Sequence, residues 1–189
     1  PIRDRLSLAL LLCQKVQKRI DMRSLAAVSK LCAQFSARSE QERLLLRLRR
    51  CRRRGADFFP AWLLLRNMEH LTAEFPALLE RCAHERRPED AFFERFSVQL
   101  ENLAVYFFFR YLLKASVDGA LMEKAGACVF HVLAISRLAA SMQIEALPEL
   151  CRLCGLYSKE VEHSEENLQL LYRTIRHGAL RVGTLLAMI

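Results

Sequence analysis

The sequence is poor in the residues that interrupt helices. Its 189 residues include only six glycines and five prolines, and β-branched residues are sparse beside leucine, alanine, arginine and glutamate. This composition favours helix nearly throughout the chain. A doubly wound parallel-sheet core needs strands and a glycine-rich loop, and the sequence offers neither. We therefore predict an all-α protein.

Long apolar runs are also missing. The run from Val105 to Phe109 ends at Arg110, far below the roughly 20 residues of a membrane span. No signal peptide is evident, so we expect a cytoplasmic protein with no membrane contact. The sequence also lacks the commonest motifs of nucleotide-binding, hydrolase and zinc sites: Gly-x-Gly-x-x-Gly, the P-loop, Gly-x-Ser-x-Gly and His-Glu-x-x-His.

Clustered cysteines are absent. The seven cysteines are mostly single and lie on apolar helix faces, where a thiol acts as a small hydrophobic group in a reducing compartment. The exception is the Cys151-Arg-Leu-Cys154 pair, but a lone C-x-x-C is weak evidence for a metal. On a helix both sulfurs would face the core. We predict no metal site.

What the chain has in abundance is apolar residues at helical spacing. They make up 52% of the sequence and allow a substantial core in one domain, residues 1–189. The longest aromatic stretch, about residues 88–116, reads as one helix that apolar side chains almost encircle between Leu103 and Leu113. We predict an irregular multi-helix bundle of about seven to nine helices around this long aromatic central helix. Glu101 and Arg110 lie within its apolar shell and need partners from other helices.

Positive charge is concentrated in one segment. The formal net charge is +8, and seven arginines lie between Arg43 and Arg54. One interpretation is a solvated helix end whose cations complement the helix dipole. The other is a docking patch for an acidic protein or nucleic acid, with Arg47, Arg50 and Arg53 as substrate or partner contacts. No aromatic residue is interleaved to stack a base, so nucleic acid is the less favoured partner.

The densest polar run is residues 157–168. A helix from about Pro148 would carry Leu150, Cys151, Cys154, Tyr157 and Val161 on one face, and this is the face we expect to be buried. Ser164 has the position of an N-cap, followed by two glutamates in the first turn of a new helix.

Two interpretations of this corner stay open. In the first, it is a helix–cap–helix corner with solvated acids. In the second, Glu160 and His163, which are three apart and therefore neighbours on a helix, face a ligand or a substrate amine. A Glu-x-x-His pair also suits a carboxylate-bridged metal centre, but that centre needs a second pair and the sequence has none. His131, on an apolar helix, is more typical of a satisfied core residue than of a ligand.

Several segments together resemble one family, the bacterial flagellin lysine-N-methylases. The Tyr157–Leu168 run is similar to the C-terminal signature of this family. Three further segments carry the resemblance: Arg3-Asp-Arg-Leu-Ser-Leu-Ala-Leu10 at the start, Asp57-Phe-Phe-Pro-Ala-Trp62, and Glu101-Asn-Leu-Ala-Val-Tyr-Phe-Phe-Phe-Arg-Tyr111 with Asp118-Gly119 after it.

The resemblance implies transfer of a methyl group from S-adenosylmethionine to lysine side chains of flagellin. It also implies a cysteine-rich N-terminal half, expected to hold an iron–sulfur cluster, that this sequence does not include. The chain therefore looks like the C-terminal helical portion of such an enzyme, in keeping with its first residue, Pro1. Whether it is active without the other half stays open.

Methylation needs the neutral lysine amine, and a carboxylate, tyrosine or histidine can accept its proton or orient it. The alternative is a noncatalytic helical interaction module that docks a partner through Arg43–Arg54. The candidate residues for the enzyme are Tyr157, Glu160, Glu162 and His163 as catalytic residues, and Tyr106, Arg110 and Asn167 as cofactor-binding residues.

Overall fold

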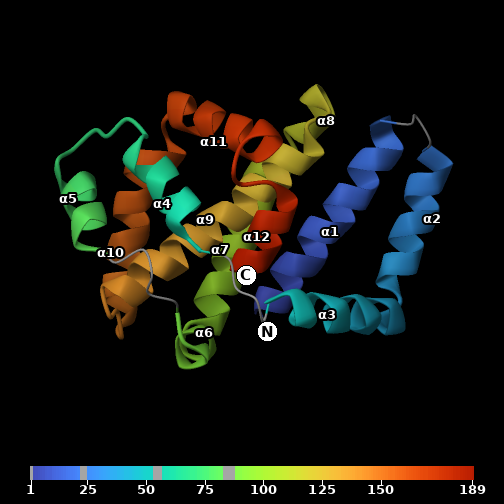
Figure 1. Ribbon diagram of the computed structural model, residues 1–189, viewed down its shortest axis with the longest axis horizontal. Helices are drawn as coiled ribbons and strands as arrows, with labels where there is room; N and C mark the ends of the chain where they lie inside the picture. Colours follow the sequence, from blue (N-terminus) through green and yellow to red (C-terminus); the bar gives the residue numbers. More distant parts are fainter. Residues whose placement is uncertain (1, 22–24, 53–56, 83–87) are drawn as a thin grey trace.

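The computed structural model describes residues 2–21, 25–52, 57–82 and 88–189 (Figure 1). Every regular element among them is helical, which confirms the predicted all-α class. The elements that start before residue 100 are α1 (Ile2–Asp21), α2 (Leu25–Ser36), α3 (Arg38–Arg52), α4 (Phe59–Arg66), α5 (Glu74–Arg81), α6 (Asp90–Arg95) and α7 (Ser97–Phe107). The rest are the π-helical segment η1 (Phe108–Leu112), α8 (Ala115–Asp118), α9 (Leu121–Ser141), α10 (Leu147–Tyr157), the π-helical segment η2 (Ser158–Glu162), α11 (Glu165–His177) and α12 (Val182–Met188).

The central helix is α9. All its residues from Lys124 to Ala139 are buried, because α1, α7, α10, α11 and α12 pack around it (Figure 1). Gly126 permits the close approach of α11, since a Cβ at this position would lie 2.8 Å from Cγ2 of Ile175. Although α9 is long and apolar, no helix in the described part of the chain has the length and hydropathy of a membrane span.

Residues 88–116 do not form the single central helix that we expected. The segment is divided into α6, α7, η1 and the start of α8, with a bend at Phe96, so the described residues contain more helices than the seven to nine predicted. Leu100, Phe107 and Tyr111 face α9 and are buried. The apolar residues on the opposite side remain in contact with solvent, and α9 occupies the centre instead.

Two segments of the backbone are π-helical, and each continues the α-helix before it. In η2 the N–H of His163 donates to the carbonyl of Ser158, 3.1 Å away and five residues earlier. Such wider turns are rare and often lie at functional sites. Here η1 carries Arg110, and η2 carries Glu160 and Glu162, so both segments hold residues of the predicted corner.

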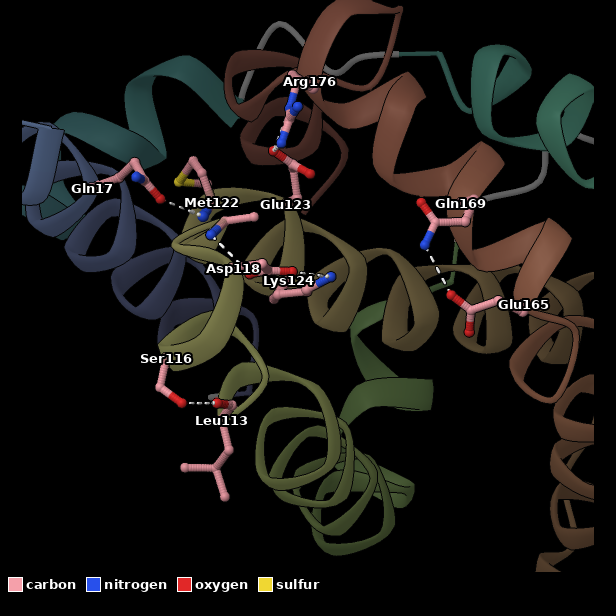
Figure 2. A network of polar contacts seen from close by, with 11 residues as sticks. Gln17, Leu113, Ser116, Asp118, Met122, Glu123, Lys124, Glu165, Gln169 and Arg176 are labelled. Carbon is pink, nitrogen blue, oxygen red and sulfur yellow. Dashed lines mark hydrogen bonds and ion pairs between the residues drawn. The ribbon is translucent and has the colours of Figure 1, made fainter.

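The predicted break at Asp118-Gly119 is confirmed (Figure 2). Gly119 has φ of +69°, a left-handed conformation that suits glycine. The Asp118 carboxylate accepts from the Ala120 N–H at 3.0 Å and pairs with the Lys124 ammonium at 3.1 Å. Two further contacts in Figure 2 join α9 to its neighbours: Gln17 of α1 accepts from the Met122 N–H, and Glu123 pairs with Arg176 of α11.

Candidate functional site

Glu160 is directed into the protein. Its side chain is fully buried, and its carboxylate accepts from the Leu71 N–H at 2.7 Å and from the Thr72 hydroxyl at 2.5 Å. Both donors belong to the loop between α4 and α5. Burial alone would raise the pKa of Glu160, but the hydrogen bonds from Thr72 and Leu71 outweigh it and leave the pKa below its ordinary value. Glu160 is therefore an ionised anchor for this loop.

Asn167 holds the same loop from the first turn of α11. Its Oδ1 accepts from the Glu69 N–H at 2.8 Å, and its Nδ2 donates to the Glu69 carbonyl at 2.8 Å and to the Glu160 carbonyl at 2.9 Å. Both amide hydrogens are used, and the residue is buried. We call Glu160, Asn167 and the loop residues 67–73 that they hold the loop clamp.

Tyr157 lies beneath the loop clamp in the core. Its hydroxyl is 2.8 Å from Nδ1 of His131, whose ring is stacked on Phe107 with centroids 4.7 Å apart. Burial lowers the pKa of His131 to about 3 and raises that of Tyr157 well above its ordinary value, so both side chains are neutral. His131 is a core residue, as predicted, but only its Nδ1 is satisfied, because its buried Nε2 has no hydrogen-bond partner among the described residues.

Glu162, two residues after Glu160, is directed toward the surface of η1. Its carboxylate pairs with Nε of Arg110 at 2.9 Å, accepts from the Ser158 hydroxyl at 2.7 Å, and accepts from the Tyr106 hydroxyl. The prediction that Arg110 takes its partner from another helix is confirmed. The Glu162 side chain is only 2% exposed, whereas Arg110 is 38% exposed. We call Tyr106, Arg110, Ser158 and Glu162 the surface cluster.

Aromatic rings and cations surround this surface cluster. The Arg110 guanidinium lies 5.9 Å from the ring centroid of Tyr106 and 5.7 Å from that of Tyr111, and the Lys114 ammonium lies 5.6 Å from the latter. Burial and the neighbouring Glu162 raise the pKa of Tyr106. Its hydroxyl therefore stays protonated and donates to Glu162, while its oxygen keeps the capacity to accept another hydrogen bond.

His163 is exposed at the end of η2 and does not share a face with the buried Glu160. The expected Glu160–His163 neighbourhood assumed an α-helix, and it is corrected by the wider π turn, in which residues three apart no longer lie above one another. The predicted N-cap is confirmed, because the Ser164 hydroxyl accepts from the Asn167 N–H at 3.2 Å.

The cysteine pair is not on the core face that we expected. Cys151 is exposed and Cys154 is half-buried, whereas Leu153 takes the inward position between Leu150 and Tyr157. Neither sulfur has a metal-binding neighbourhood: in the described ranges no three His, Cys, Asp or Glu residues are grouped so that they could hold a metal ion.

The structure brings six of the predicted residues into one corner, with His163 beside them in sequence, but the predicted arginines lie elsewhere. Arg47 is exposed on α3, which packs with α1, α2 and α12 on the side of the molecule opposite α10 (Figure 1). Arg53 and the side chain of Arg50 lie outside the described residues. Sequence reasoning missed Thr72 and its loop, for which a short polar segment between two apolar helices is the only signal.

Comparison with known protein families identifies a family for this chain. The family model of the FliB lysine N-methylase C-terminal domain matches residues 1–189. Neither the curated proteins nor the solved structures that were searched gave a match. Because the family model covers the entire sequence, with the two π-turns and the polar corner inside it, the chain belongs to the FliB lysine N-methylase C-terminal domain family.

Proposed function

We propose that this domain presents the substrate in a protein lysine N-methyltransferase, in which a methyl group passes from S-adenosylmethionine to lysine side chains of flagellin. The observation that carries the proposal is the family match over residues 1–189. The surface cluster is the place in the described structure whose chemistry suits a lysine amine. We assign no role in this function to the arginines between Arg43 and Arg54.

The electrostatics of the surface cluster favour the reactive form of the amine. A lysine in the surface cluster would lie near two cations, the Arg110 guanidinium and the Lys114 ammonium, and only one carboxylate, that of Glu162. The excess of positive charge lowers the lysine pKa and increases the neutral fraction. The amine can donate an N–H to the hydroxyl oxygen of Tyr106, because this hydroxyl already donates its own hydrogen to Glu162. The amine is then oriented by one hydrogen bond to a fixed tyrosine.

The predicted site residues divide into two groups by exposure. Tyr106, Arg110 and His163 reach the surface, and we assign them to contact with the reactants, with His163 as acceptor of the lysine proton. Glu162 is a positioning residue that holds Tyr106 and Arg110. Tyr157, Glu160 and Asn167 are buried and keep the corner folded.

The surface cluster does not by itself fit the methyl donor. A cofactor that contains a nucleoside needs a concave pocket around most of its surface. Pockets of about 530, 320 and 210 Å³ in the described structure are lined by residues of other segments. Every nitrogen and oxygen of the Asn167 amide is already bonded within the loop clamp. We therefore assign the surface cluster to the lysine and no step to a donor held there.

The test is the methylation state of flagellin in cells. Deletion of the gene should remove methyl-lysine from flagellin, measured by mass spectrometry of its peptides, and the wild-type gene should restore it. Arg110→Ala should slow restoration by about tenfold, because the amine loses its positioning and its local positive field. Arg95→Ala is the matched control, since Arg95 is 51% exposed and pairs with Glu145 on a different face. Methyl-lysine that persists after deletion would refute the proposed function.

A further inference from the structure

The outer face of α7, η1 and α8 carries a row of exposed apolar side chains, which the exposed Asn102 interrupts between Val98 and Val105. Contiguous patches of this kind are uncommon on monomeric proteins and mark interaction sites. The side chain of Leu113 projects away from the helices behind it (Figure 2). We call this row the apolar ridge, and its members are Val98 (64% exposed), Val105 (63%), Phe109 (75%), Leu113 (63%) and Val117 (90%).

The apolar ridge contains a π-turn. Its last four members are four residues apart, a spacing that drifts around an ordinary α-helix because one turn takes 3.6 residues. The wider turn of η1 opposes this drift between Val105 and Leu113. After Leu113 the backbone tightens, because the Lys114 N–H donates to the Tyr111 carbonyl and the Val117 N–H donates to the Lys114 carbonyl, each three residues earlier.

One edge of the apolar ridge is positively charged. Arg110 and Lys114 directly follow Phe109 and Leu113, so they border the ridge on the side of the surface cluster. The acidic side chain of Glu101 on α7 is already paired with Arg5 of α1. A partner that fits has an apolar stripe bordered by acidic residues, and this edge leads directly to Tyr106.

We propose that the apolar ridge docks an amphipathic helix of flagellin, with its apolar stripe on Phe109 and Leu113 and its acidic border against Arg110 and Lys114. This inference rests on the proposed function, because it names how the substrate of that function is held. The continuity of ridge and surface cluster would place a lysine from the edge of the docked helix beside Tyr106. Two helices that pack side by side in this way bury their apolar stripes against each other.

The experiment measures binding of the chain to purified monomeric flagellin by calorimetry, without methyl donor. The double substitution Phe109→Glu with Leu113→Glu should weaken binding at least about tenfold, because it removes a central aromatic anchor and buries charge. Leu46→Glu is the matched control: Leu46 is 62% exposed but lies on α3, and affinity should stay within about twofold. Circular dichroism verifies that all variants are folded.

A third variant tests the charged border. Lys114→Glu should weaken binding several-fold at low salt, and the difference from wild type should shrink at high salt as the charges are screened. Failure of the wild-type chain to bind flagellin, or equal binding by the ridge variant, overturns the docking proposal. So does a wild-type dimer in sedimentation that the ridge variant dissociates, because the occupant would then be a second copy. Binding through the ridge with methyl-lysine unchanged after gene deletion would refute the proposed function alone.

Discussion

Two glutamates of η2, two residues apart, serve two different regions. Glu160 belongs to the loop clamp, where its partners are a backbone N–H and a threonine hydroxyl inside the protein. Glu162 belongs to the surface cluster, where its partners include the long side chains of Tyr106 and Arg110, which are 41% and 38% exposed. The same residue type in the same turn thus has a closed set of partners in one region and a partly open set in the other.

The difference separates stability from function. In the loop clamp a substitution leaves backbone donors buried without an acceptor, which lowers the free energy of unfolding. In the surface cluster Arg110 can turn toward solvent or toward a ligand, and the Ser158 and Tyr106 hydroxyls still donate to Glu162 when Arg110 is replaced. A substitution of Arg110 therefore affects mainly what the surface can bind. We therefore expect substitutions in the loop clamp to reduce stability most, and substitutions of exposed residues at the surface cluster to reduce methylation with little loss of stability.

The largest effect on stability is expected for Glu160→Ala. It removes a buried carboxylate with two strong donors and leaves the Leu71 N–H and the Thr72 hydroxyl unsatisfied, so the free energy of unfolding should fall by about 3–5 kcal/mol. Urea unfolding followed by circular dichroism measures it. Glu80→Ala, an exposed glutamate on α5, should change it by less than about 0.5 kcal/mol. A loss below about 1 kcal/mol for Glu160→Ala would show that the loop clamp is not an anchor.

The ionisation of Glu160 should also make the stability of the protein depend on pH, with a smaller effect than Glu160→Ala. The pKa of Glu160 is lowered in the folded protein, so its ionised form stabilises the fold above the unfolded glutamate pKa of about 4.3. This contribution is lost as the pH falls through the folded pKa. The stability difference between wild type and Glu160→Gln should therefore be full at pH 7 and should shrink as the pH falls below the unfolded pKa of about 4.3. A difference that stays constant as the pH falls, as expected for the control Glu80→Gln, would contradict the assignment.

The surface cluster was more predictable from sequence than the loop clamp. An arginine in an apolar shell needs an acidic partner, and residues 157–168 are the densest source of acids, so charge pointed to this segment as the source of a partner for Arg110. Which of its acids makes the pair, Glu162, comes from the structure. The Ser164 cap has an equally local signature. Leu71 contributes to the loop clamp only its backbone N–H, which every residue except proline carries, so no sequence pattern marks it.

Two errors in the sequence reasoning have one physical origin, the assumption of regular α-helices. The π-turn of η2 rotates His163 away from Glu160, and no residue type signals such a turn. In η1 and α7, apolar residues on all sides predicted a buried helix, but Phe109 and Val105 face outward and α9 is the enclosed one. An apolar helix that docks a partner and an apolar helix in a core have the same composition.

The smallest effect on stability, and the sharpest test of the comparison, is expected for His163→Ala. The side chain is exposed and lies outside the loop clamp, so the free energy of unfolding should change by less than about 0.5 kcal/mol. If His163 accepts the lysine proton, the initial rate at which methyl-lysine appears in flagellin should fall about tenfold or more, measured by mass spectrometry after induction of each variant. His177 is also exposed but lies at the end of α11, and His177→Ala should leave that rate unchanged. Equal rates for the two variants would remove His163 from the reactive surface and leave Tyr106 and Arg110 as its proposed contacts, whereas a loss of stability would place His163 with the loop clamp.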